Sequence, residues 1–424
     1  MAKTSSNIIV IGAGASGIMA AGIAAGQGGS VKLLEKTPVY GRKLSMTGNG
    51  RCNITNIAPI TEFPRHYHSS FRFLRHALHS FTNQDCIAFF EGLGIAFGEE
   101  DNGRVLPVNS NGHEISVAFA KWAERCGVKI VPNISVTKIL VINNKTIGIE
   151  AKDFDGNIAQ IKADAVIIAT GGKSYPKTGS TGDGYELAKS VGHTIIPLRP
   201  ALVPLETQGD LSKRLQGVSL PHVSVTLWVD NHKETAQIGD MIFTHYGVSG
   251  PLILNLSRIA VDSKIVQKDV SISIDLVPNI DYQILFKEFL GYIKNHNKQQ
   301  FKNMLTIYLP KKMISVCCEE INITGDKMLN QISNNELKRL RVWLKSLTLK
   351  VTGHRSFDEA MITAGGVDTN QVNPKTLESK IIKGLHFAGE VLDIDAETGG
   401  FNLQAAFSTG WLAGNACLMD ISND

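Results

Sequence analysis

The pattern of apolar and polar residues at the start of the chain predicts a strand, a glycine turn, a helix and a second strand. An apolar run at Asn7–Ile11 opens into the sequence GAGASG at positions 12–17, and small residues follow over Ile18–Ala25. A second apolar run, Val31–Leu34, ends at the acidic residue Glu35. Two short apolar runs separated by a helix-length segment are typical of the first βαβ unit of a parallel sheet.

The three glycines of this turn meet the requirements of a dinucleotide-binding loop. Gly12 allows a tight turn, Gly14 lets backbone amides approach a pyrophosphate, and Gly17 lets the helix pack close to the sheet. The charge of the ligand then lies at a helix N-terminus. Glu35 stands at the end of the second strand, where a carboxylate accepts hydrogen bonds from a ribose hydroxyl.

The periodic segments that follow continue the α/β pattern. A meander over Ser135–Ala169 ends in the apolar run AVIIA, as expected of a buried parallel strand. Thr170, Gly171 and Gly172 come next and form a second place where backbone can approach the ligand. Helical spacing predicts three further helices, at Phe71–Phe81, Asp85–Leu93 and Glu114–Arg125. An Asp-Asn-Gly turn predicts a hairpin at Ile95–Val108.

The composition of the chain changes at Pro197, Pro200 and Pro204. Short alternating segments over Val203–Val277 predict a small β-barrel or sandwich, and Tyr282–Leu347 has a helical pattern with many Lys and Asn residues. We therefore expect an α/β protein with three domains. The dinucleotide-binding domain comprises residues 1–195 and 368–424. The β-barrel substrate domain comprises residues 196–278 and 348–367, and the helical insert comprises residues 279–347.

Two more segments carry candidate ligand contacts. The loop after Glu35 is rich in glycine and flanked by cations, which suits anionic groups because successive backbone amides can form a nest; a mobile surface loop is the alternative. Near the C-terminus, a short predicted strand is followed by a second group of candidate residues, which it would place at the same edge of the sheet. The candidates are Arg42, Lys43, Thr47, Asn49, Gly50, Arg51, Cys52, Gly389, Glu390, Asp393, Gly399 and Gly400.

Separate glycine clusters that each follow an apolar strand predict one extended ligand touched at several points. FAD fits better than NAD alone, because reduction places negative charge near N1 of the isoalloxazine and the final helix, which starts near Phe401, would point its positive end there. NAD alone would leave the cationic loop and the C-terminal return less well explained. We see no second glycine motif for a dedicated NAD(P)H domain.

Composition sets limits on partners and location. The 424 residues are 43% hydrophobic and 19% charged with a net charge of +4, and the charges look scattered, so nucleic acid is an unlikely partner although a local patch remains open. Six cysteines without a CxxC pair predict neither a metal site nor disulfides, and indicate a cytoplasmic setting. Polar residues interrupt the uncharged segment Phe401–Met419, which we therefore interpret as a buried helix and not a membrane span.

Five motifs together resemble one family. They are the glycine turn with Glu35-Lys36, the stretch Gly41–Asn53, the stretch Thr244–Pro251, the stretch Phe357–Val367, and the segment from Ala388 to Gln404. In this order they are similar to the BaiN/YhiN family of NAD(P)/FAD-dependent oxidoreductases, in which some members are described as aminoacetone oxidases and others as reductases of unsaturated bile-acid or steroid ketones.

The resemblance implies FAD bound non-covalently in a glutathione-reductase-like domain that is interrupted by a β-barrel and a helical insert. It assigns pyrophosphate contacts to Gly14, Ala15, Ser16 and Gly17, the ribose to Glu35, and the adenine to the backbone of Val136. It assigns the ribitol or pyrophosphate to Asp393. The flavin ring contacts that it implies are Asn49, Gly50, Arg51, Asn402 and Leu403.

The expected chemistry is reduction of FAD by a transiently bound NAD(P)H, followed by hydride transfer to an activated double bond of a small or apolar substrate. Such a reduction also needs an acid at the carbonyl or α-carbon. His245 and Tyr246 are candidates, because they lie in a glycine-rich loop before a predicted helix at Pro251, and Arg355 could orient an anionic group. A structural hydrogen-bonding role is the alternative for each.

Three other functions stay open at this point. An amine oxidase of the aminoacetone type would pass the electrons to oxygen. A tRNA-modifying flavoprotein would use the same nucleotide fold with a concentrated cationic face. A flavin-binding sensor would keep the cofactor without turnover. The sequence specifies neither the substrate, the donor nor the oligomeric state.

Overall fold

The predicted first βαβ unit forms the middle of a five-stranded sheet with the order β19-β10-β1-β2-β6. Every pair of neighbouring strands in it is parallel, so the carboxyl ends of the strands lie at one edge. The apolar runs of the sequence correspond closely to its strands. Their bounds are β1 Asn7–Ile11, β2 Ser30–Leu34, β6 Lys129–Val131, β10 Ala165–Ile168 and β19 Leu385–Phe387.

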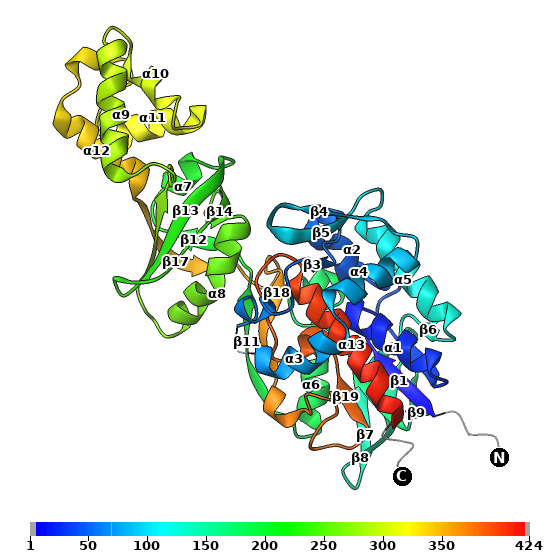
Figure 1. Ribbon diagram of the computed structural model, residues 1–424. Coiled ribbons are helices and arrows are strands. Elements are labelled where there is room, and N and C mark those ends of the chain that lie inside the picture. Colours follow the sequence, from blue (N-terminus) through cyan, green and yellow to red (C-terminus); the bar gives the residue numbers. More distant parts are fainter. Residues whose placement is uncertain (1–5, 69, 420–424) are drawn as a thin grey trace. The chain divides into compact units, whose positions relative to one another are not determined.

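The computed structural model describes residues 6–68 and 70–419, apart from the side chains of Asn49 and Met419. The chain folds into two compact units, which Figure 1 shows. Unit 1 comprises Met1–Pro200 and Met361–Asp424 and contains the parallel sheet, and unit 2 comprises Ala201–Ala360.

Helices cover one face of the parallel sheet, and a second sheet and a helix cover the other. Ile8 and Val10 of β1 pack into the same apolar cluster as residues of α1, α5 and α13, whereas Ile9 and Ile11 pack with β7, β8 and α6. This alternation is what a strand buried on both faces requires. The elements are α1 Ala15–Gly26, α5 Gly112–Arg125, α13 Phe401–Met419, β7 Ser135–Ile142, β8 Lys145–Lys152, β9 Ile158–Lys162 and α6 Asp183–Ser190.

Helices α1 and α13 lie side by side across this sheet (Figure 1). Small residues permit their approach: a Cβ atom at Gly410 would lie 2.4 Å from the carbonyl oxygen of Ser16, and one at Gly414 would lie 2.5 Å from that of Ala20. The uncharged C-terminal segment is thus a buried helix, as predicted. None of the helices in the described part of the chain is long and apolar enough to cross a membrane.

The rest of unit 1 is built from short elements that flank the sheet. The predicted hairpin is present as an antiparallel pair, β4 and β5, joined through an Asp-Asn-Gly turn in which Asn102 has a φ of 61°. The bounds are α2 Arg42–Met46, β3 Thr55–Asn56, α3 Phe71–Ser80, α4 Asn83–Gly92, β4 Phe97–Glu100, β5 Arg104–Pro107, β11 Ile195–Ala201 and β18 Ile362–Val367.

Unit 2 joins a closed barrel to a helical segment, with one apolar cluster running through both. The predicted helix at Pro251 is α8, with the proline in its first turn, as is usual for that residue. The barrel strands in their spatial order are β12 Leu205–Thr207, β15 Gly247–Ser249, β14 His232–Phe243, β13 Ser219–Val229, β16 Val270–Asp275 and β17 Leu347–His354. The helices are α7 Leu211–Arg214, α8 Pro251–Ile265, α9 Tyr282–Asn295, α10 Phe301–Leu305, α11 Lys311–Glu320 and α12 Asn334–Lys345.

One predicted segment belongs elsewhere. We expected residues 348–367 to rejoin the barrel, but only β17 does so, and β18 pairs with β11 in unit 1. All six residues of β18 are buried, whereas a barrel strand alternates between buried and exposed side chains. Gly365 explains the close pairing, because a Cβ atom there would lie 2.3 Å from the carbonyl oxygen of Pro197.

The charges are also less evenly spread along the chain than we expected. The helical segment Tyr282–Leu347 carries 11 Lys and Arg against 5 Asp and Glu, out of 43 and 39 in the whole chain. The remainder of the chain therefore has slightly more acidic than basic residues. The net positive charge of the protein resides in this segment of unit 2.

Candidate functional site

The parallel sheet brings four predicted contact segments to one edge. The loops after β1, β2, β10 and β19 begin at Gly12, Glu35, Ala169 and Ala388, and each follows the carboxyl end of its strand. Two hydrogen bonds tie these loops together: Gly12 N donates to Leu34 O at 2.8 Å, and Ser16 Oγ donates to Ala388 O at 3.2 Å. In doubly wound folds this edge is where ligands bind.

The glycine turn after β1 requires glycine at two of its positions for reasons of space within the protein. Gly12 has a φ of 98°, and a Cβ atom there would lie 2.6 Å from Ala169 O. A Cβ atom at Gly17 would lie 1.8 Å from Gly12 O. The first and third glycines thus allow the turn and the close approach of α1, as predicted.

The second glycine faces open space. A Cβ atom at Gly14 would meet no protein atom within 4 Å, although Gly14 has an ordinary extended conformation with φ −89° and ψ −168°. Gly14 is also the N-cap of α1 and offers no side chain to cap the first amides of the helix. Uncapped helix amides beside an open space fit the pyrophosphate of a dinucleotide.

Glu35 braces the glycine turn. Its Oε2 accepts a hydrogen bond from Ala13 N at 3.0 Å, and its Oε1 accepts from Thr37 N and Thr37 Oγ1, both at 2.9 Å. A carboxylate has about four acceptor positions, so one remains for a ribose hydroxyl. Lys36, the next residue, donates to Thr181 Oγ1 and pairs with Asp183.

The loop after β2 contains α2 and a short 3₁₀ helix at Thr47–Gly50. Arg51 forms a two-bond ion pair with Glu100, with nitrogen to oxygen distances of 2.6 and 3.3 Å. Cys52 is fully buried, and burial raises the pKa of its thiol to about 12, so it is neutral and packs in the core. Arg42 is exposed, and Thr47 Oγ1 donates to Leu44 O. A Cβ atom at Gly50 would meet open space, and the side chain of Asn49 lies outside the described residues.

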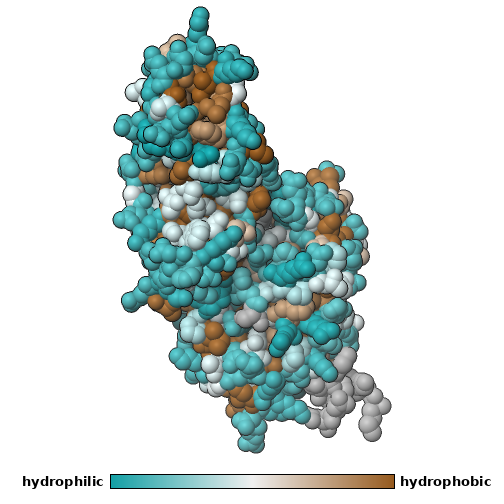
Figure 2. Space-filling model, turned by 60° about the vertical axis from the view of Figure 1, so that its left-hand side comes forward, coloured by the Kyte–Doolittle hydropathy of each residue, from teal (hydrophilic) through white to brown (hydrophobic). Residues whose placement is uncertain are grey.

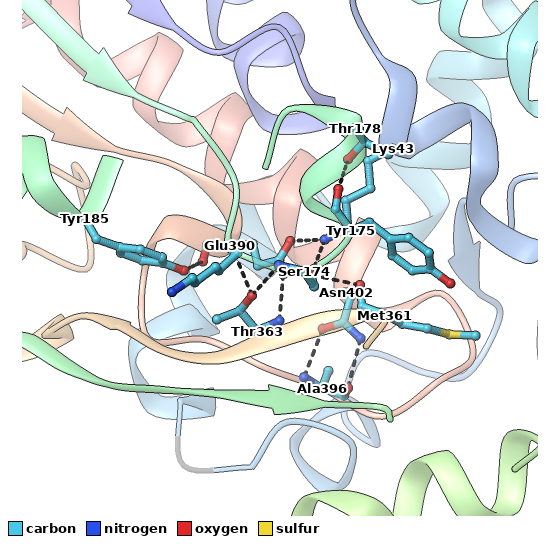
Figure 3. A network of polar contacts seen from close by, with 11 residues as sticks. Lys43, Ser174, Tyr175, Thr178, Tyr185, Met361, Thr363, Glu390, Ala396 and Asn402 are labelled. Atoms are coloured by element: carbon cyan, nitrogen blue, oxygen red, sulfur yellow. Dashed lines mark hydrogen bonds and ion pairs between the residues drawn. The ribbon is translucent and has the colours of Figure 1, made fainter. Parts of the chain in front are cut away.

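A polar network links three loops of unit 1 beside this site (Figure 3). Lys43 Nζ donates to Ser174 Oγ and pairs with Glu390 Oε2, both at 2.7 Å. Glu390 Oε1 accepts from Ser174 Oγ at 3.1 Å and from Thr363 N at 2.8 Å. Gly172 lies against Thr363, because a Cβ atom at Gly172 would be 2.5 Å from Thr363 Oγ1. Lys43 and Glu390 thus contact each other, and the ammonium keeps one donor for a further group.

The loop around Gly171 contributes a buried hydroxyl. Thr170 Oγ1 has no hydrogen-bond partner among the described residues. It lies close to Gly184, because a Cβ atom at Gly184 would be 2.0 Å from Thr170 Oγ1. Gly171 itself has a φ of 72°, which favours glycine.

The C-terminal segment approaches the same edge. Gly389 has a φ of 77° and donates from its amide to Thr409 Oγ1 at 2.9 Å, and Asp393 N donates to Val367 O at 3.0 Å. A Cβ atom at Gly400 would lie 2.3 Å from Thr55 O. These close approaches fix the entry to α13, which begins at Phe401.

Asn402 and the residues near it support this entry. The Asn402 amide bonds to both the N–H and the C=O of Ala396, at 3.0 and 2.9 Å (Figure 3). Leu403 is partly buried against the helix-side core, and Gly399 has a φ of 117°. Val136, on β7, helps to line a cavity of about 570 Å³ together with Asp183 and Glu186.

The three predicted catalytic residues cluster in unit 2. The ring centroids of His245 and Tyr246 lie 4.8 Å apart, and the Arg355 guanidinium carbon lies 4.6 Å from the Tyr246 centroid. Tyr246 Oη donates to Glu359 at 3.1 Å. Arg355 is held by two carboxylates, Glu359 at 2.7 Å and Glu206 at 2.9 Å. Partial burial and the charge of Glu359 raise the pKa of the Tyr246 phenol.

Sequence reasoning missed several members of these clusters. Glu359 belongs to the Phe357–Val367 motif, so the motif was the available signal for it. Thr363 lies in the same motif. Glu206 and Ser174 had no such signal, because hydroxyl and carboxyl residues of ordinary spacing become significant only when the fold brings them together.

The parallel sheet, its glycine turns and the open helix N-terminus define the class of Rossmann-type dinucleotide-binding proteins. Residues 6–416 match the family model described as HI0933-like protein Rossmann domain. The chain therefore belongs to the HI0933-like family and is a flavin-dependent oxidoreductase.

Two relatives match over almost their whole length. The chain is 34% identical to a ribosomal RNA dihydrouridine synthase of Haemophilus influenzae over 428 residues, which is 100% of both chains. It is 33% identical to a 3-dehydro-bile acid delta(4,6)-reductase of Clostridium scindens, over 96% of this chain and 98% of the relative.

A solved structure shares the fold at low identity. The 3-ketosteroid delta1-dehydrogenase from Sterolibacterium denitrificans superposes with a TM-score of 0.52 and 12% identity, over 99% of this chain and 100% of the other. A likeness at this identity concerns the fold alone.

Proposed function

We propose that the protein uses FAD, with NAD(P)H as electron donor, to reduce a C=C bond conjugated to a carbonyl group. Two relatives support this reaction by name, because dihydrouridine and a bile acid reduced at the delta(4,6) positions both arise by adding two hydrogens across such a bond. The structural observation that carries the proposal is the open space at Gly14 beside the uncapped first amides of α1, and the candidate acid is the Tyr246 phenol of unit 2, hydrogen-bonded to Glu359 and covered by Arg355.

The residues at the edge of the parallel sheet would hold the cofactor. The amides of Ala15, Ser16 and Gly17 would bind the pyrophosphate in the open space at Gly14, and Glu35 would accept from a ribose hydroxyl. The N-terminus of α13 would stabilise negative charge on the ring. When bound, FAD supplies the hydride.

Tyr246 would supply the proton that completes the reduction. The electrons of the double bond form a new C–H bond between the α-carbon and the phenol proton, while the β-carbon accepts the hydride. The positive charge of Arg355 over the ring lowers the energy of the resulting phenolate, which solvent reprotonates. The raised pKa of Tyr246 keeps the phenol protonated between turnovers.

The proposal is tested by two half-reactions under anaerobic conditions. NADH or NADPH should bleach the flavin, and a conjugated cyclic enone should restore its colour while one equivalent of saturated ketone forms. Reoxidation by oxygen with an amine as the reductant, and none by enones, would instead identify an amine oxidase of the aminoacetone type.

Glu359 is expected to position Tyr246 and not to react itself. Glu359→Gln keeps the size of the side chain but removes the charge that raises the pKa of Tyr246. We expect kcat to fall about tenfold, the worth of one charge-assisted hydrogen bond. The alkaline limb of the kcat profile should also move to lower pH. Asp358→Asn, which removes an exposed charge next in the chain, is the matched control and should change neither quantity.

Ribosomal RNA is a second candidate substrate. Two relatives that match over nearly the whole chain are named as ribosomal RNA dihydrouridine synthases, from Haemophilus influenzae at 34% and Escherichia coli at 30% identity. The uracil ring holds a C=C bond conjugated to a carbonyl, so the same hydride and proton transfers apply. Analysis of nucleosides from ribosomal RNA treated with enzyme and NAD(P)H would detect dihydrouridine.

A further inference from the structure

The exposed Lys and Arg side chains of unit 2 are concentrated in its helical segment. The segment Tyr282–Leu347 carries a clear excess of positive charge, while the rest of the chain carries 32 basic and 34 acidic residues. Figure 2 shows hydrophilic side chains over most of this segment, in the upper part of the view, around a smaller hydrophobic group. A segregated charge of this kind attracts polyanions.

Helix α9 directs part of this charge outward. Its inward face is defined by Leu285 and Phe289, which are fully buried. Lys287 and Lys294 are exposed and seven residues apart, so they lie on the same outward face, separated by roughly 10 Å of helix rise. Lys298, also exposed, follows the end of the helix at Asn295.

These lysines differ from others of the same segment in what they contact. Lys302, Lys327 and Lys345 pair with Asp326, Glu336 and Asp275 at 2.6 to 2.7 Å, so their charge is used within the fold. Among the described residues, no carboxylate pairs with Lys287, Lys294 or Lys298. Lys287 and Lys294 on the outward face of α9, and Lys298 just past its end, are thus three exposed like charges without an ion pair in the described part of the chain.

We propose that Lys287 and Lys294 on the outward face of α9, together with Lys298 just past the end of the helix, form a surface, here the α9 face, that binds phosphate groups of ribosomal RNA. The inference rests on the proposed reduction of a conjugated ring bond and adds the surface that would hold an RNA carrying that ring. Lysine ammonium groups suit this role because they meet phosphates as flexible point charges without reading sequence. Single phosphate contacts spaced along a helix position an RNA and leave its bases free for the site.

The test measures binding without turnover. Affinity of the purified holoprotein for protein-free ribosomal RNA is followed by fluorescence anisotropy over a series of salt concentrations. The combined variant K287E, K294E and K298E should lose most of its affinity, and the slope of log K against log salt should become smaller by about two to three, because each lysine neutralises about one phosphate. The combined variant K129E, K152E and K162E changes three exposed lysines of unit 1 by the same charge and is the matched control.

Two outcomes would overturn the inference. One is an unchanged salt slope in the α9 variant. The other is equal loss in both variants, which would point to net charge and not to this face. Binding of the α9 face to anionic phosphatidylserine vesicles, with no binding of RNA, would also overturn it. Enone reduction by the α9 variant should stay normal, so failure of this inference is distinguishable from failure of the proposed reaction.

Discussion

Replacing Gly14 by valine is expected to abolish FAD binding and leave the fold intact. The backbone of Gly14 has φ and ψ values open to any residue, and a Cβ atom there would meet no protein atom within 4 Å. Added methyl groups would occupy only the space that we assign to the pyrophosphate. Loss of two or three charge-assisted hydrogen bonds from the α1 amides corresponds to at least a roughly hundredfold weaker affinity.

Titration of the apoprotein with FAD, followed by flavin fluorescence, measures this effect. Gly26→Val is the matched control, because Gly26 lies at the other end of α1 and also faces open space. Both apoproteins should unfold at nearly the same temperature, and only the Gly26 variant should gain stability from FAD. If Gly14→Val binds FAD as tightly as the parent, the pyrophosphate lies elsewhere and the assignment of the cradle is wrong.

Tyr246→Phe is expected to lower kcat for enone reduction by roughly a hundredfold or more, the usual effect of removing a general acid. The reduction of the flavin by NAD(P)H should be unchanged, because that half-reaction needs no proton from Tyr246. Stopped-flow absorbance separates the two half-reactions. The removal of a single hydroxyl from a partly buried ring should have little effect on folding.

The control is Tyr292→Phe, which removes the hydroxyl that donates to Gln299 in the helical segment of the same unit. It should leave both half-reactions at the parent rate. A normal rate in Tyr246→Phe, with a large loss in His245→Asn, would transfer the acid role to the neighbouring imidazole. Equal rates in all three variants would remove this cluster from the chemistry.

Local sequence information was sufficient for the central sheet and its glycine turn. The packing of Gly17 against Gly12 lies within one short motif, which therefore encodes it, whereas the tight space at Gly12 is closed by Ala169, which follows β10 far along the chain. The closed barrel was predictable as a class, since its strands alternate. Strand β18 was not, because Ala364, Gly365 and Gly366 carry no alternation, and their close approach to β11 appears only in the fold.

The polar network at Lys43 shows why side-chain roles are harder to predict. Lys43 and Glu390 are 347 residues apart in sequence, and each was expected to face the cofactor. Their pairing follows from the parallel sheet, which places the loops after β2 and β19 at one edge. A motif identifies such residues as candidates, but the direction of each charged group depends on partners that the sequence does not place beside it.

The central claim, that this sheet edge holds FAD, is tested most directly by the flavin content of gently purified protein. We predict a yellow protein that releases about one FAD per chain on heat denaturation, as one site of the Rossmann type would hold. A colourless protein that takes up no flavin when FAD is added to the folded chain would contradict the account.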